Sequence, residues 1–162
     1  MTVSPLRCRV DSVALMAACL FLTACGPDYV KQYDKPLTYG EFVKKKDVDF
    51  PVPPSSQDIY YGIYEDWQAF TLIVRFQAPV QDCLSEIDTV IAYDDKIYTR
   101  TSSYPRITVT NVAPQCAGCL NSATWFTPNT ISNGIYAGQD SSHTPQIWVD
   151  LDKGIFYFME TD

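Results

Sequence analysis

Hydrophobic and polar positions begin to alternate near residue 57, and the alternation predicts two strands. Residues 58–64, rich in Ile and Tyr, predict the first strand, which Glu65 and Asp66 follow as a turn. Residues 68–77 predict a half-buried second strand, with Ile73 as an apolar exception on its polar face. The core face of this second strand consists of Phe70, Leu72, Val74 and Phe76, and the polar face of Thr71, Arg75 and Gln77.

A helix is predicted directly after Pro79, because proline is favoured at the start of a helix. Its apolar side chains recur at spacings of three and four, as on the core face of one helix. The stripe consists of Val80, Cys83, Leu84, Ile87 and Ile91, while Asp82, Glu86 and Asp88 are expected to face out. We expect the helix to end at Asp94 and Asp95, whose negative charge is unfavourable at a helix C-terminus.

A second hairpin is predicted at the end of the sequence. Ile147, Val149 and Leu151 alternate with Trp148 and Asp150, residues 152–154 (Asp-Lys-Gly) supply turn chemistry, and residues 155–159 form the returning strand. Two strands, a helix and two strands predict an α+β fold. We expect an antiparallel sheet of two hairpins with one helix packed on one face, in ββαββ order.

Residues 96–144 are expected to form a long irregular insertion before the last hairpin. One strand is expected within them, at residues 106–112, together with a turn at Asn133 and Gly134. Long irregular segments in compact domains are usually functional or mobile. We therefore expect a recognition surface in this insertion.

The first 25 residues carry an export signal. Arg7 and Arg9 precede the apolar run of residues 13–22, and small residues follow, as in a secretory signal peptide. The run is too short for a membrane-spanning helix, which needs about 20 apolar residues. The sequence Leu22-Thr23-Ala24-Cys25 resembles the lipobox of bacterial lipoproteins. This resemblance implies that signal peptidase II cuts before Cys25 and that the Cys25 thiol carries a diacylglycerol. By resemblance to the enterobacterial sorting rule, Gly26 in place of an aspartate implies sorting to the outer membrane, on its periplasmic face.

The expected domain organisation has three parts. Residues 1–24 form the signal peptide, residues 25–56 the lipidated cysteine and a proline-rich tether, and residues 57–162 a single α+β domain. The tether would hold the domain off the membrane. A short helix at residues 39–46, resting on the domain, is the alternative for this segment.

Charge limits the classes of partner. Cleavage removes Arg7, Arg9 and Asp11 and leaves 10 basic and 18 acidic residues, a net charge of −8. Without a basic stripe, nucleic acid is not an expected partner, and attachment to the membrane must come from the acyl chains on Cys25. Complementary charge speeds encounter, so an acidic domain favours a basic protein partner.

Three further mature cysteines, Cys83, Cys116 and Cys119, are disulfide candidates, because export leads to an oxidising compartment. One of them must stay unpaired, and a buried Cys83 could remain as a small inert hydrophobic residue. Together with His143 they have the ligand types of a zinc site. Their spacing is not that of a recognised zinc finger, so we expect no metal and no cofactor.

The sequence contains none of the common catalytic motifs, neither a nucleophile elbow, nor a phosphate-binding glycine loop, nor His-Glu-x-x-His. We therefore predict a non-enzymatic, periplasm-facing lipoprotein that binds another macromolecule, such as an immunity or inhibitor protein of the envelope. A binder of cell-wall glycan, a structural envelope component and a small envelope hydrolase remain alternatives. The candidate binding residues are Trp67, Trp125, Tyr136, Asp140 and His143.

Overall fold

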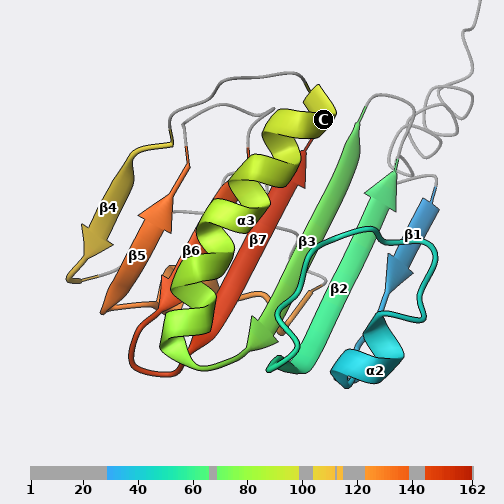
Figure 1. Ribbon diagram of the computed structural model, residues 1–162, viewed down its shortest axis with the longest axis horizontal. Coiled ribbons are helices and arrows are strands. Elements are labelled where there is room, and N and C mark those ends of the chain that lie inside the picture. The colour runs from blue at the N-terminus through green and yellow to red at the C-terminus, as the bar shows by residue number, and fades with distance from the viewer. Residues whose placement is uncertain are drawn as a thin grey trace, which may run out of the picture.

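The computed structural model describes residues 29–65, 69–98, 104–111, 113–114, 123–138 and 145–161. These residues form an α+β fold with one antiparallel sheet and one main helix, α3, against one of its faces (Figure 1). The elements are β1 (Tyr29–Gln32), α2 (Tyr39–Phe42), β2 (Gln57–Glu65), β3 (Phe70–Gln77), α3 (Val80–Tyr98), β4 (Arg106–Val109), the 3-10 helix η1 (Pro128–Thr130), β5 (Gly134–Ala137), β6 (Gln146–Asp150) and β7 (Ile155–Thr161). The predicted α+β class, with its antiparallel sheet, is confirmed.

The seven strands of the described part follow the order β1-β2-β3-β7-β6-β5-β4 across the sheet, each antiparallel to its neighbour. The first three strands form a meander, α3 crosses the face of the sheet, and the last four strands return from the far edge. As a result, the C-terminal strand β7 lies in the centre of the sheet, paired with β3 (Figure 1).

The predicted ββαββ order is wrong, because β4 and β5 lie between the helix and the last hairpin and belong to the sheet. The expected strand at residues 106–112 is β4, which ends at Val109. Gly134, predicted as a turn residue, is the first residue of β5. A Cβ on Gly134 would lie 2.3 Å from the carbonyl oxygen of Val149, so glycine is needed for the close approach of β5 to β6.

Residues 29–56, predicted to be a tether, pack on the sheet. β1 pairs with β2, and a capping box between Thr38 and Glu41 starts α2. Phe42 is 3% exposed, and Phe50 packs against Phe158 with 4.6 Å between the ring centroids. Residues 29–56 therefore belong to the folded unit, and a short helix does rest on the domain.

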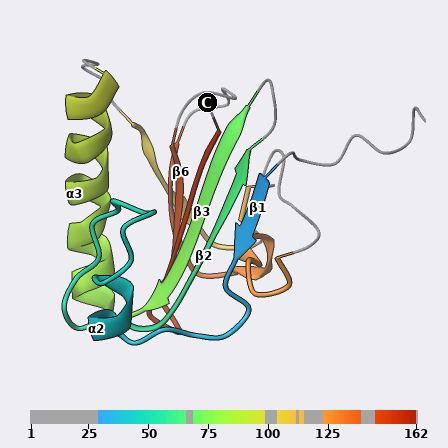
Figure 2. The same ribbon diagram turned by 90° about the vertical axis from the view of Figure 1, so that its right-hand side faces the viewer.

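Both faces of the sheet are covered (Figure 2). On one face, α3, α2 and residues 43–56 bury a helix-side cluster; on the other, the segment around η1 covers an opposite cluster. The strand members of the helix-side cluster are Ile59, Tyr61, Ile63, Leu72, Val74, Phe76, Ala137, Ile147, Val149, Phe156 and Phe158. Those of the opposite cluster are Tyr64, Ile73, Val109, Tyr136, Trp148, Ile155, Tyr157 and Met159. The second covered face explains Ile73, whose apolar side chain did not fit a half-buried strand.

Helix α3 begins where predicted, but its buried face is wider than the predicted stripe. Cys83 and Ile87 are fully buried, while Leu84 is half-buried at the border of the contact. Glu86, predicted to face out, is 6% exposed, and Asp94, predicted to end the helix, is 3% exposed. The prediction failed for Glu86 because residues 39–54, assumed to be a tether, cover that flank of the helix. The helix also continues past Asp94 to Tyr98.

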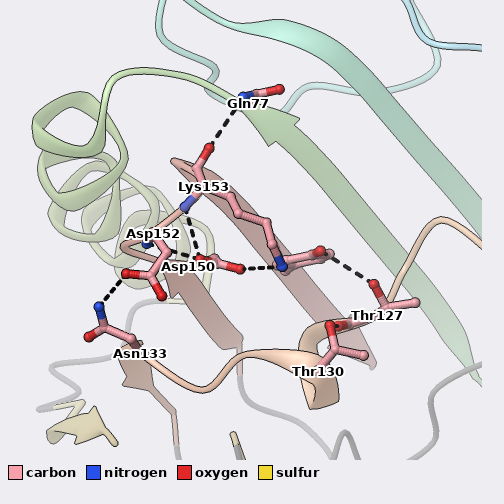
Figure 3. A network of polar contacts seen from close by, with 8 residues as sticks. Gln77, Thr127, Thr130, Asn133, Asp150, Asp152 and Lys153 are labelled. Carbon is pink, nitrogen blue, oxygen red and sulfur yellow. Dashed lines mark hydrogen bonds and ion pairs between the residues drawn. The ribbon is translucent and has the colours of Figure 1, made fainter.

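The turn between β6 and β7 is built from Asp150 to Gly154, as the Asp-Lys-Gly sequence predicted (Figure 3). One carboxylate oxygen of Asp150 accepts the backbone N–H groups of Asp152 and Lys153, both at 3.0 Å, and the other pairs with the Lys153 ammonium at 3.2 Å. Gly154 follows with a φ of +63°, the left-handed conformation that closes such turns. The Asn133 side chain donates to Asp152 and ties this turn to the start of β5.

Candidate functional site

A groove runs between α3 and residues 39–54, on the face of the sheet that carries the helix. Its volume is about 520 Å³, and apolar and aromatic side chains supply much of its lining. The lining residues are Tyr39, Phe42, Val43, Lys45, Val48, Asp49, Phe50, Pro51, Val52, Pro53, Pro54, Glu86 and Thr89. This volume falls within the range of known ligand sites.

The wall of the groove is a proline-rich strip that is fixed at several points. Its three prolines carry no N–H groups that would need partners, and the Ser56 N–H donates to the Pro53 carbonyl at 2.9 Å across a turn at Pro54 and Ser55. The Tyr93 hydroxyl on α3 donates to the Asp49 carbonyl at 2.6 Å, and the Ser55 hydroxyl donates to the Asp82 carboxylate at 2.6 Å. The Tyr61 hydroxyl donates to Asp47 at 3.0 Å from the sheet. The groove is therefore held open by contacts to both the helix and the sheet.

Glu86 is the most unusual group in the groove. Its side chain is almost fully buried, and its Oε1 atom finds no hydrogen-bond partner among the described residues. Burial raises the pKa of this carboxyl from 4.5 to about 7, because the charged form is poorly solvated there. The group can thus be either neutral or ionised near neutral pH, and it has an unused capacity for a hydrogen bond or an ion pair.

Lys45, the basic residue of the lining, does not neutralise Glu86. Its ammonium donates to the Tyr33 hydroxyl at 3.1 Å and lies 4.3 Å from the centroid of the same ring. This cation–π contact and hydrogen bond hold Lys45 on the α2 side of the groove. The groove therefore combines apolar walls with a carboxyl that is free to accept a partner.

Two of the predicted binding residues, Trp125 and Tyr136, belong to the opposite cluster. The Trp125 ring stacks on Tyr60 at 5.3 Å, and Tyr136 is 5% exposed and packs 5.4 Å from Trp148. Both are used in packing, on the face of the sheet away from the groove. The other binding candidates, Trp67, Asp140 and His143, and the lipidation site Cys25 lie outside the described residues.

Cys83 carries a free thiol at the buried start of α3. It approaches the carbonyl oxygens of Ala78 and Gly154 at 3.7 and 3.6 Å, and burial raises its pKa to about 11. A disulfide through Cys83 is not formed here, which agrees with a small inert hydrophobic role. Cys116, Cys119 and His143, the other members of the possible zinc set, lie outside the described residues. Within the described part of the chain, no group of three or more His, Cys, Asp or Glu side chains could hold a metal ion.

Sequence reasoning missed the groove because its wall was taken for a tether. One signal was present in that segment: Thr38 and Glu41 have capping-box spacing and precede Phe42. The helix gave a weaker signal, since Glu86 lies about 60° around the helix axis from Cys83, just beyond the edge of the predicted stripe. Neither signal shows by itself what covers the helix.

Comparison with known proteins finds no family model, no curated protein and no solved structure that matches this chain. Over the residues described, no helix is both long and apolar enough to cross a bilayer.

Proposed function

We propose that this protein is a lipid-anchored protein of the cell envelope that binds another macromolecule and catalyses no reaction. Its anchor is the diacylglycerol on Cys25, its location the periplasmic face of the outer membrane, and its partner a protein with basic character. An immunity or inhibitor function belongs to this class. The lipobox resemblance supports the anchor, and the net charge of −8 after cleavage supports the basic partner.

The groove beside α3, with the unpartnered carboxyl of Glu86, is the observation that carries the binding function. A buried carboxyl without a partner costs stability, whereas a paired one does so far less. Residues that cost stability persist where function needs them. A basic side chain of a partner, entering the apolar groove, would supply the missing contact to Glu86.

The test compares two exposed apolar residues. Val43 lines the groove and is 55% exposed, while Ile107 lies on the edge strand β4 and is 51% exposed. The mature protein is prepared in three forms, the wild type, Val43→Asp and Ile107→Asp, and is extracted in mild detergent. Each form is then used to capture partners from envelope extracts. Because both sites are exposed, neither change should unfold the domain. We expect Val43→Asp to lose the partner and Ile107→Asp to retain it.

The same capture experiment separates the alternatives. Binding to a basic protein should weaken as salt rises, since exposed charges are screened beyond about 8 Å at 0.15 M salt. Binding to isolated cell wall that resists salt would favour the glycan binder. Equal capture by Val43→Asp and wild type would show that the groove is not the binding site.

A further inference from the structure

The connection between the lipidated cysteine and the first strand is much shorter than the tether predicted from the sequence, which extended to residue 56. β1 begins at Tyr29, four residues after Cys25. Four residues span at most about 14 Å when fully extended. If Cys25 carries the lipid, as the proposed function requires, the start of β1 must lie next to the bilayer. A long tether, as expected from the sequence, would have imposed no such restriction.

The strand pairing identifies what lies beside this point. Tyr29 pairs with Glu65, and Glu65 pairs in turn with Phe70, the first residue of β3. Two strand spacings separate Tyr29 from Phe70, about 10 Å. Phe70 is 39% exposed, one of the three large hydrophobic residues that are exposed in the described part of the chain. The strand end nearest the anchor thus carries an exposed aromatic side chain.

The other end of the sheet is far from the anchor. β2 has nine residues, a length of about 30 Å, and its first residue, Gln57, pairs with Gln77 at the end of β3. The β6–β7 turn lies at this end, since the Gln77 side chain donates to the Lys153 carbonyl at 3.2 Å. In Figure 1, α2 and this turn lie at one end of the sheet and the start of β1 at the other.

We propose that the domain rests on the bilayer with the Tyr29–Glu65–Phe70 end of the sheet, and that the Phe70 ring enters the headgroup region. Apolar side chains of surface-bound proteins reach about 5–10 Å into this region. Charge does not provide the contact, because Glu65 beside Phe70 is acidic and exposed. The short connection to the anchor keeps Phe70 at the surface, and α2 with the groove wall then points toward the periplasm.

Site-specific photocrosslinking in the full chain tests this orientation. A photoreactive phenylalanine analogue is placed at Phe70 or, as controls, at Ile107 on β4 and Lys153 in the distal turn. After illumination of intact membranes, phospholipid adducts are measured by mass spectrometry. Labelled palmitate and membrane fractionation are measured on the same samples. We expect lipid adducts from position 70 and none above background from positions 107 and 153.

A spacer variant tests the cause of the contact. Insertion of about 20 Gly/Ser residues after Gly26 adds a coil with a typical span of about 25 Å, so the adduct at position 70 should be lost while palmitate remains. Palmitate and membrane attachment without any adduct at position 70 would overturn the orientation and leave the anchor intact. Equal adducts at all three positions would also overturn it. Cys25→Ser, which has no thiol to lipidate, is the control without palmitate. If the wild type also carried no palmitate, both the anchor and the orientation would be overturned.

Discussion

At the scale of single residues, Glu86 shows how a charged group can be tolerated in a core at a cost. Its neighbours in the groove are largely apolar, and no described residue provides a hydrogen bond to Oε1. Asp94, two turns later on the same helix, is equally buried but accepts a hydrogen bond from the Tyr104 hydroxyl at 2.8 Å. Asp94 Oδ1 has no partner among the described residues either, so the two carboxylates differ in the Tyr104 hydrogen bond to Asp94 and in the position of Glu86 in the groove.

Glu86→Gln should remove a pH dependence of stability. The folded-state pKa of about 7 lies above the usual 4.5, so the folded protein holds a proton that the unfolded chain releases between these values. The free energy of unfolding of the wild type should thus fall as pH rises from about 4.5 to about 7, and this group should cause no further change above pH 7. The fall should be at most about 3 kcal/mol, and less where water reaches the carboxyl. Urea unfolding from pH 4 to 8 measures this. Parallel curves for wild type and Glu86→Gln would contradict the assignment.

At the scale of elements, the hairpin of β6 and β7 depends on one backbone conformation. Gly154 has a φ of +63°, and a Cβ there would lie 2.4 Å from the carbonyl oxygen of Ala78. The N–H of Ala78 also donates to the carbonyl of Gly154 at 2.9 Å, so the turn is joined to the start of α3. The turn and the helix therefore position each other.

Gly154→Ala should destabilise the protein by about 1–2 kcal/mol or more, because an L-residue is disfavoured in the left-handed region and the new methyl group meets backbone. Gly40→Ala is the matched control. Gly40 lies in α2 with nothing within 4 Å of its added Cβ, so alanine should be neutral or stabilise by up to about 1 kcal/mol. Thermal unfolding of both variants checks the pair. Similar losses in both would show that the Gly154 turn has no special requirement.

The segment of residues 39–56 behaves as an element of the core. Phe42 packs edge-on against Tyr61 with 5.7 Å between the ring centroids, and its neighbour Val43 points outward. Phe42→Ala should therefore cost about 3–5 kcal/mol, and Val43→Ala no more than about 0.5 kcal/mol. Urea midpoints measure both. If the segment were a detached tether, both changes would be close to neutral.

At the scale of the whole molecule, the sequence predicted those elements whose periodicity is strong. β2, β3, the start of α3 and the last hairpin were expected at nearly their observed positions. β1 and β5 have four residues each, too few to show an alternation, and Gly134 resembles a turn residue. The helix-side groove depends on residues 39–54 packing against α3, and local patterns do not report such distant contacts. The site at Glu86 was missed for that reason.

The central strands send alternate side chains into both clusters, so the two sides of the sheet should unfold together. In β7, Phe156 and Phe158 face α3, while Tyr157 and Met159 face the segment around η1. Neither cluster can persist without β3, β6 and β7, which predicts a single cooperative transition. The thiol of Cys83 reports on the helix side, and tryptophan fluorescence, with fully buried Trp148, reports on the other. In a background with Cys116→Ser and Cys119→Ser, thiol labelling and fluorescence should give the same urea midpoint, whereas two separate midpoints would show that one layer detaches before the other.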